Sequence, residues 1–306
     1  MNKGYRAIFF DWDGTAVTSR KAPVDEIVSR MKGLLNKGIK LAIISGTTIE
    51  NIAGGRLQDY FTEKELENLF DEDVYNPSDE KQKIPYQEGR GAYNYKFNKN
   101  KTLELFNSMI PEKSVLLDVH KACFDIHMKL LEDYEYKTDI VFSRPNYCKI
   151  DLMVDNNRGE QLFLQENEVD ILKENLTRHG FNEGILGLIK ISEEIGEKYD
   201  LDLVVTTDAK YLEVGVSSKS DNVNTILNYF KDEFGILPEE CSFWGDEYIG
   251  IDEGLYGSDS FMITDSSKSG DFFDVSNLKG KRPEEVIILS GGVERFLEFL
   301  SSQENL

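Results

Sequence analysis

The sequence predicts an α/β fold in which a parallel sheet carries helices on both faces and an α+β unit is inserted into the chain. Short apolar runs of the buried-strand type at residues 5–10 and 39–45 favour the parallel sheet, because a helix-spaced apolar pattern separates them. The middle of the chain instead mixes amphipathic helices with short strands, which indicates the insertion. We therefore expect a core formed by residues 1–107 and 206–306 and an inserted unit formed by residues 108–205.

The helix between the first two predicted strands has its own start and stop signals. Pro23 suits the first turn of a helix, and Gly38 suits the position just after its end. Since a strand, a helix and a strand in this order form a right-handed unit, the two strands should run parallel. The apolar residues at helical spacing are Val24, Ile27, Val28, Met31, Leu34 and Leu35.

The same order of elements returns near the end of the chain. A helix around residues 223–230 leads into the apolar run 241–244, which predicts another strand of the parallel sheet. We expect further strands at 260–263 and 286–289 and a last helix near 293–300. The inserted unit should hold helices at 115–131 and 168–179 and strands at 139–142, 148–154 and 201–206, and residues 71–100 should form a connecting loop and a hairpin.

The composition is typical of a soluble globular protein. The chain has 306 residues, of which 40% are hydrophobic, so it can bury one large core or two moderate ones. No apolar run is long enough to span a membrane, and the first five residues lead into a strand rather than a signal peptide. Cys123, Cys148 and Cys241 are widely spaced and form no CxxC pattern, which predicts reduced thiols and a cytoplasmic protein.

The net charge of −21 argues against nucleic acid and anionic membranes as partners. It also repels phosphorylated small molecules at long range. Salt screens exposed charges beyond about 8 Å, however, so a local metal ion and a local lysine could still bind an anion.

The run Asp11-Trp12-Asp13-Gly14-Thr15 directly follows the first predicted strand. A carboxylate at the end of a buried strand is costly to desolvate unless a cation or a reaction requires it there. Two carboxylates in this spacing suit phosphoryl transfer, in which one attacks phosphorus and the other carries the proton. An ordinary turn after a strand explains the same residues, because Asp and Gly are common in turns.

Three further segments follow in an informative order. Ser45-Gly46-Thr47 comes after the second strand, Lys219 precedes a helix, and Gly245-Asp246-Glu247 follows a later strand. Ligands of open parallel sheets bind at the carboxyl ends of the strands, so all four segments can converge.

These four segments, in this order, resemble the motifs of the haloacid dehalogenase superfamily of phosphotransferases. The closer likeness is to the sugar-phosphatase and phosphomannomutase-like branch, whose large cap lies between the second and third motifs. The stretch 211–214, which leads on to Lys219, looks like the strand that returns from that cap. The resemblance implies a Rossmann-like core and an inserted α+β cap that selects the substrate.

The resemblance also implies a role for each matching residue. Asp11 would be the nucleophile and Asp13 the general acid/base, while Asp11, the backbone carbonyl of Asp13 and Asp246 would hold Mg²⁺. The phosphoryl oxygens would be bound by Ser45, Gly46 and Lys219. Members that break carbon–halogen bonds lack the second aspartate, so Asp13 favours phosphate monoester chemistry on a small molecule, a sugar phosphate by analogy with the branch. A phosphomutase that uses the same residues and a non-catalytic ligand-binding descendant are the alternatives.

The fourth segment departs from the family pattern. Relatives commonly have a second acid four residues after the motif aspartate, and here that position is Gly250. Glu247, Asp252 and Glu253 are the nearest candidates. Asp252 could bind Lys219 or a metal-bound water, or it could equally cap the next helix. Weaker candidates for substrate contacts, each also typical of polar turns, are Arg90, Arg144, Asn146 and Lys149.

Overall fold

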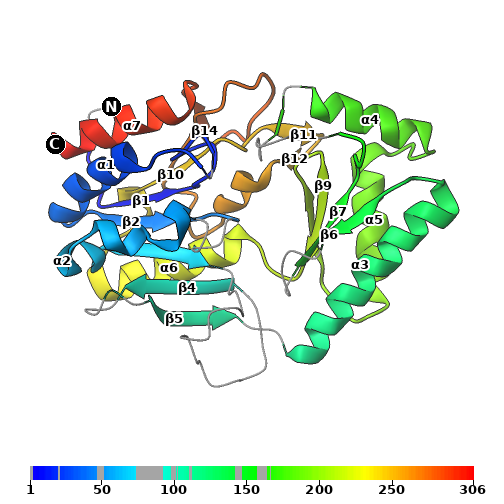
Figure 1. Cartoon of the computed structure of the whole chain (residues 1–306), viewed down its shortest axis with the longest axis horizontal. Coiled ribbons are helices and arrows are strands. Elements are labelled where there is room, and N and C mark those ends of the chain that lie inside the picture. The colour runs from blue at the N-terminus through cyan, green and yellow to red at the C-terminus, as the bar shows by residue number, and fades with distance from the viewer. Residues whose placement is uncertain are drawn as a thin grey trace.

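The chain folds into two lobes, with both termini in the lobe drawn on the left of Figure 1. We refer to the left lobe as the core and to the right lobe as the cap. The structure is a computed structural model, and it describes residues 3–19, 21–46, 52–73, 92–97, 101, 103–109, 112–141, 147–156, 164–165 and 167–306.

The core is built on a sheet whose described strands are ordered β14-β13-β10-β1-β2-β3-β4-β5. The strands from β14 to β3 run parallel, whereas β4 and β5 continue the sheet in antiparallel pairing. The predicted α/β fold with a parallel sheet is therefore confirmed. The strands span Ala7–Phe10 (β1), Lys40–Ile43 (β2), Leu69–Asp73 (β3), Ala92–Phe97 (β4), Leu103–Met109 (β5), Cys241–Gly245 (β10), Asp271–Asp274 (β13) and Val286–Ile288 (β14).

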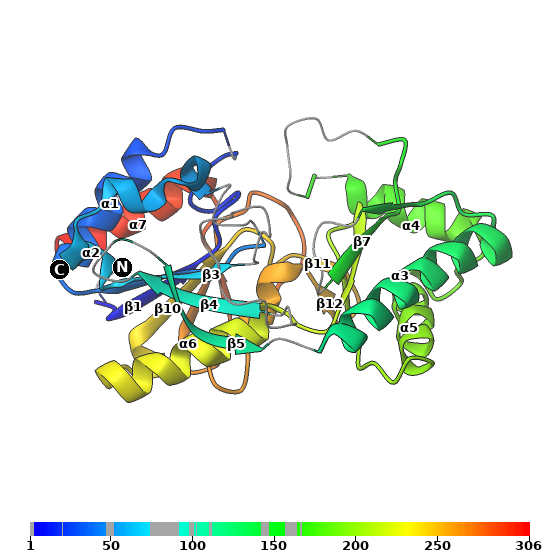
Figure 2. The same cartoon turned by 60° about the horizontal axis from the view of Figure 1, so that its bottom comes forward.

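Helices cover both faces of this sheet. All four residues of β1 are buried. Because successive side chains of a strand point to opposite faces of the sheet, they pack in two separate apolar clusters. Ile8 and Phe10 pack in the cluster of α1 (Asp25–Asn36) and α7 (Gly292–Glu304), whereas Phe9 packs with α6 (Lys219–Phe234) on the opposite face. Figures 1 and 2 show α1 and α7 on one side of the sheet and α6 on the other.

The cap contains an antiparallel sheet of order β6-β7-β9-β8. Its buried positions, such as Ile150 opposite Leu212, face a second apolar core, while Lys149 and Glu213 alternate with them and pair with each other. The strands span Asp139–Val141 (β6), Tyr147–Asp151 (β7), Val204–Thr207 (β8) and Tyr211–Gly215 (β9). The helices of the cap are α3 (Lys113–Tyr134), α4 (Glu168–Arg178) and α5 (Gly184–Glu197).

The inserted unit ends later in the chain than the boundary at residues 205 and 206 that the sequence predicts. Strand β8 crosses that boundary and β9 lies after it. Strand β9 pairs with β7 and β8 rather than with any described strand of the core. The backbone hydrogen bonds of β9 thus belong to the cap sheet, which extends to Gly215.

Two other elements differ from expectation. Residues 260–263, predicted as a strand, lie mostly in a short 3₁₀ helix (Ser258–Met262), and β13, between β10 and β14, was not predicted. A further two-stranded hairpin, β11 (Gly250–Asp252) and β12 (Leu255–Tyr256), follows Asp246 in the chain. Within the described part of the chain, no helix is both long and apolar enough to cross a membrane.

Candidate active site

Three neighbouring strands of the core sheet deliver the predicted residues to one edge. Asp11 follows β1, Ser45 follows β2 and Asp246 follows β10, and β1 lies between the other two strands. Backbone hydrogen bonds extend past the strand ends, since the amide of Asp11 donates to the Trp244 carbonyl at 2.9 Å. The backbone therefore fixes the first carboxylate beside its neighbours.

The first turn of α6 brings a cation to this edge. Lys219 is the first residue of α6, and the side chain of Ser218 caps the helix together with Asp221. The Nζ atom of Lys219 lies 3.1 Å from Oδ1 of Asp11 and 2.7 Å from Oδ1 of Asp259. The lysine side chain is only 11% exposed, so these charges interact with little screening by solvent.

The loop after Asp13 wraps the Asp246 carboxylate. Thr15 donates its hydroxyl to Oδ1 of Asp246 at 3.0 Å, and Gly14 adopts a left-handed φ of 89°. A Cβ atom on Gly14 would lie 2.2 Å from Oδ2 of Asp246, so only glycine fits this position. Asp13 itself is half-buried, and its backbone pairs with Val17 across the turn.

Asp259 is the residue of this site that the sequence reasoning missed. It lies in the 3₁₀ helix Ser258–Met262 with a relative exposure of 1%. One oxygen of its carboxylate accepts from Lys219, and the other accepts from the amide of Glu247 at 2.7 Å. Asp259 therefore occupies the place beside Lys219 that was considered for Asp252.

Asp252 lies elsewhere. It ends strand β11, and its carboxylate is 3.7 Å from Nζ of Lys173 on α4 of the cap. Asp252 makes no contact with Lys219, which pairs with Asp11 and Asp259, and it caps no helix, because β11 is followed by the strand β12. The hairpin carries Asp252 away from the strand ends and toward the cap.

Burial raises the pKa values of the acids at this site. Burial is the largest cause of the shift of Asp11 to a pKa of about 8; Lys219 opposes the shift, and Asp259 and Asp13 add to it. Burial, followed by repulsion from Asp259, also raises the pKa of Asp246 well above its usual value. Burial and the nearby Asp208 raise the pKa of Glu247 to about 7.

Lys219 alone does not neutralise these carboxylates. Burial by itself would lower the pKa of Lys219, but Asp11 and Asp259 together raise it well above its ordinary value, so the lysine is charged. The pKa values of Asp11 and Asp246 are raised even with Lys219 present, which indicates that the positive charge nearby does not fully balance the ionised carboxylates. A divalent cation beside these two carboxylates would supply it.

The donor set fits Mg²⁺. Among the described residues, no group of three or more His, Cys, Asp or Glu side chains is arranged to hold a metal. Mg²⁺ is instead commonly held by one or two carboxylates, with waters and substrate phosphate completing the shell. Asp11 and Asp246 are two such carboxylates, and Asp11 lies close enough to Asp246 to raise its pKa.

The candidate phosphate-binding residues lie at the end of β2. Ser45 is 2% exposed and Gly46 is exposed at the surface. Space is available around Gly46, since a Cβ atom placed there would meet no other atom within 4 Å. Thr47, Arg90, Arg144 and Asn146 lie outside the described residues.

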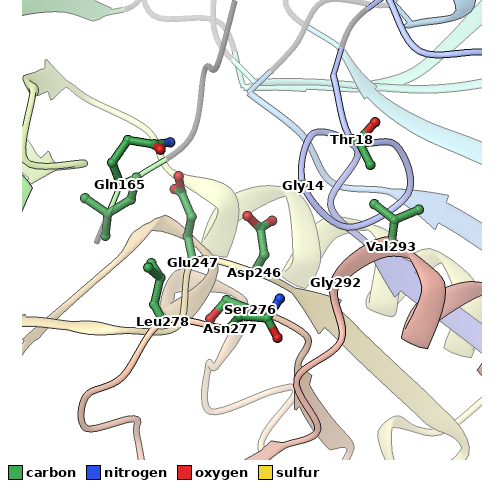
Figure 3. A pocket seen from close by; sticks show the side chains of 11 residues that line it. Gly14, Thr18, Gln165, Asp246, Glu247, Ser276, Asn277, Leu278, Gly292 and Val293 are labelled. Carbon is green, nitrogen blue, oxygen red and sulfur yellow. The ribbon is translucent and has the colours of Figure 1, made fainter. Parts of the chain in front are cut away.

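A pocket of about 350 Å³ opens next to Asp246 and Glu247, between the core and the cap. Figure 3 shows these two side chains directed into the space between Gln165 on one side and Gly14 and Thr18 on the other. Its volume lies near the lower end of the range for small-molecule sites. The lining residues are Gly14, Thr18, Leu164, Gln165, Asp246, Glu247, Ser276, Asn277, Leu278, Gly292 and Val293.

Comparison with known proteins identifies the fold. No family model matches the sequence, and no curated protein matches it. The structure is similar to IMP-bound, N-terminally truncated IMP-nucleotidase of Plasmodium falciparum, with a TM-score of 0.58 and 14% identity over 99% of this chain and 69% of that one. It is also similar to trehalose-6-phosphate phosphatase of Aspergillus fumigatus, with a TM-score of 0.52 and 14% identity over 98% of this chain and 92% of that one. The chain therefore shares the fold of these two proteins over nearly its whole length.

Proposed function

We propose that this protein is a Mg²⁺-dependent phosphate monoester hydrolase that acts on a small phosphorylated metabolite through an aspartyl-phosphate on Asp11. The observation that carries the proposal is the 3.1 Å distance between Nζ of Lys219 and Oδ1 of Asp11 at a strand end that Asp246 also borders. The residues that we propose as nucleophile, phosphate-binding cation and second metal ligand thus lie at one edge of the sheet, which supports phosphoryl transfer.

The first half-reaction transfers the phosphoryl group to the protein. Lys219, the Ser45 hydroxyl and the Gly46 amide hold the phosphoryl oxygens. A carboxylate oxygen of Asp11 forms a bond to phosphorus while the ester P–O bond breaks. Asp13 gives its proton to the leaving oxygen, so the product departs as a neutral alcohol.

The second half-reaction regenerates the enzyme. Asp13, now ionised, takes a proton from a water molecule whose oxygen attacks phosphorus. The bond between phosphorus and Asp11 breaks, and inorganic phosphate leaves. The same residue thus serves as acid in one step and as base in the next.

Mg²⁺ would be held by the carboxylates of Asp11 and Asp246 and by the backbone carbonyl of Asp13. When bound, it supplies positive charge that offsets the repulsion between a carboxylate nucleophile and an anionic phosphoryl group. Lys219 adds a second positive charge, which stabilises the negative charge on the equatorial phosphoryl oxygens in the loose transition state.

The cap would select the leaving group. Support comes from the pocket beside Asp246, to which the cap contributes Leu164 and Gln165. The turn between β8 and β9 also brings Asp208 close enough to raise the pKa of Glu247. The two proteins of similar structure are named for different substrates, IMP and trehalose 6-phosphate. We therefore propose the substrate class, a sugar phosphate, by analogy and name no single compound.

The test is phosphate release from a panel of monosaccharide phosphates, disaccharide phosphates and nucleoside monophosphates, each assayed with Mg²⁺ and with EDTA. We expect Mg²⁺-dependent release from at least one class. Transfer of phosphate between hydroxyl groups of one sugar, without release, would contradict hydrolysis and identify a phosphomutase. The absence of both reactions on every compound would contradict an enzymatic role.

A further inference from the structure

The β11–β12 hairpin separates Glu247 from Asp259 in the chain, yet these two residues meet at its base. The amide of Glu247 donates to Oδ2 of Asp259 at 2.7 Å, and the amide of Asp259 donates to the Glu247 carbonyl at 3.3 Å. Above this pair, the amide of Gly257 donates to the carbonyl of Ile249 at 2.9 Å. The base is thus closed by hydrogen bonds that fix the Asp259 carboxylate.

The rest of the hairpin belongs to the cap. Ile251 and Ile249 are buried in the same apolar cluster as the residues of the cap core. Tyr248, one residue earlier, is instead buried in the cluster formed by α6 and the core sheet. The chain therefore passes from the packing of the core to that of the cap between Tyr248 and Ile249.

Polar contacts support this attachment. The carboxylate of Asp252 lies 3.7 Å from Nζ of Lys173 on α4, and a Cβ atom on Gly184, at the start of α5, would lie 3.4 Å from Oδ2 of Asp252. A core contact also exists, because the amide of Gly250 donates to the Lys281 carbonyl at 2.8 Å. Beyond Gly250, Ile251 and Leu255 pack with the apolar cluster of the cap, and Figure 1 draws β11 and β12 at the boundary between the core and the cap.

We propose that Ile251 is a positioning residue, which through the β11–β12 hairpin uses the packing of the cap to place Asp259 against Lys219. This inference rests on the proposed function, in which Lys219 binds the phosphoryl group. Protein interiors are closely packed, so removing a packing contact of the hairpin would shift the base of the hairpin, where Asp259 lies. Because Asp259 contacts Lys219, this shift would change the position of the Lys219 ammonium. A misplacement of about 1 Å in such a group can cost about 100-fold in rate.

The experiment compares Ile251→Ala with Ile126→Ala and Ile251→Val in the full-length protein. Ile126 is the matched control, because it is as buried as Ile251 and lies in the same apolar cluster, but on α3 rather than on the hairpin. Each variant is measured for kcat on the best substrate of the panel and for hydrogen exchange in a peptide covering residues 246–259. The exchange experiment requires no activity.

We expect Ile251→Ala to speed exchange at the amides of Glu247, Gly257 and Asp259 and to lower kcat by up to about 100-fold. Ile126→Ala should change neither quantity, and Ile251→Val should stay close to the wild type. Unchanged exchange in Ile251→Ala, an equal change in Ile126→Ala, or faster exchange with an unchanged kcat would overturn the inference. If the wild type releases no phosphate, the proposed function fails, and the exchange comparison alone decides whether Ile251 positions Asp259.

Discussion

The ammonium of Lys219 lies 2.7 Å from the carboxylate of Asp259, although one residue opens α6 and the other follows a hairpin that packs on the cap. The same lysine contacts Asp11 at 3.1 Å. Lys219 therefore lies between the proposed nucleophile and a fixed, buried acid. Its position depends on both, which gives Asp259 a role that can be tested separately from that of Asp11.

Replacing Asp259 by Asn should impair turnover without removing any proposed metal ligand. The amide side chain keeps its size but loses the charge that holds Lys219, and it cannot accept from both Lys219 and Glu247 as a carboxylate does. We expect kcat to fall by about 100-fold, as for a misplaced catalytic group. Asp265→Asn is the control, because Asp265 is exposed and its carboxylate contacts Lys268 at the surface, and steady-state kinetics should show it near the wild type.

Gly14→Ala should abolish activity by displacing Asp246. The added methyl group would lie 2.2 Å from Oδ2 of Asp246, and the φ of 89° disfavours alanine in any case. Gly38 is a matched control, since its φ of 81° is similar but a Cβ atom there meets nothing within 4 Å. Both variants should lose about 1–2 kcal/mol of stability from the left-handed backbone. Only Gly14→Ala should also lose Mg²⁺-dependent phosphate release, and equal losses of activity would refute the clash.

Asp13→Asn should cut the rate by about 10²- to 10⁴-fold, the usual contribution of general acid–base catalysis. Because the proposed metal contact of Asp13 is its backbone carbonyl, the Mg²⁺ concentration for half-maximal thermal stabilisation should stay nearly unchanged. A collapse in Mg²⁺ affinity would instead make the Asp13 side chain a ligand. Melting curves at several Mg²⁺ concentrations measure this directly.

The stability of the protein in EDTA should fall as the pH rises from about 4 to about 8. The folded state holds the pKa of Asp11 at about 8 and that of Glu247 at about 7, above their ordinary values of 3.8 and 4.5. In this range the folded protein therefore binds more protons than the unfolded chain, so the free energy of unfolding decreases with pH. Melting temperatures measured across this range should show the decline.

Two comparisons isolate the site from the rest of the acidic surface. Asp11→Asn removes one of the shifted groups, so its melting temperature should decline less steeply with pH than that of the wild type. Mg²⁺ should raise the melting temperature most at the high end of the range, where the carboxylates are ionised and can bind it. A wild type and an Asp11→Asn variant with the same slope would contradict the raised pKa of Asp11.

The sequence predicted the parallel sheet and the shared edge of Asp11, Ser45 and Asp246 for one physical reason. The carboxyl ends of neighbouring parallel strands meet at a single edge whatever loops follow them. The strand at 211–214 was expected from the family resemblance alone, and its sequence could not show which sheet supplies its partners. The cap boundary was misplaced for this reason, because β9 leads directly to Lys219 while pairing with β7 and β8.

Asp259 could not be predicted from the same reasoning. Its distance from Asp246 along the chain is set by the hairpin, and the hairpin is stabilised by contacts with the cap that leave no local signature. The apolar residues 261–263 also have the composition of a strand, although here they end or follow a 3₁₀ helix. Gly245 gave an indirect signal, since a Cβ atom there would lie 2.2 Å from Oδ2 of Asp259.

Detection of the covalent intermediate tests the central claim most directly. The wild type and Asp11→Asn would be mixed with the best substrate and Mg²⁺, quenched in acid during turnover, digested and analysed by mass spectrometry, with phosphate release measured in parallel. We predict a phosphorylated peptide that contains Asp11 in the wild type, and neither this peptide nor phosphate release in Asp11→Asn. Sustained phosphate release by Asp11→Asn, or a wild type that turns over with phosphate attached to a different residue, would contradict the account.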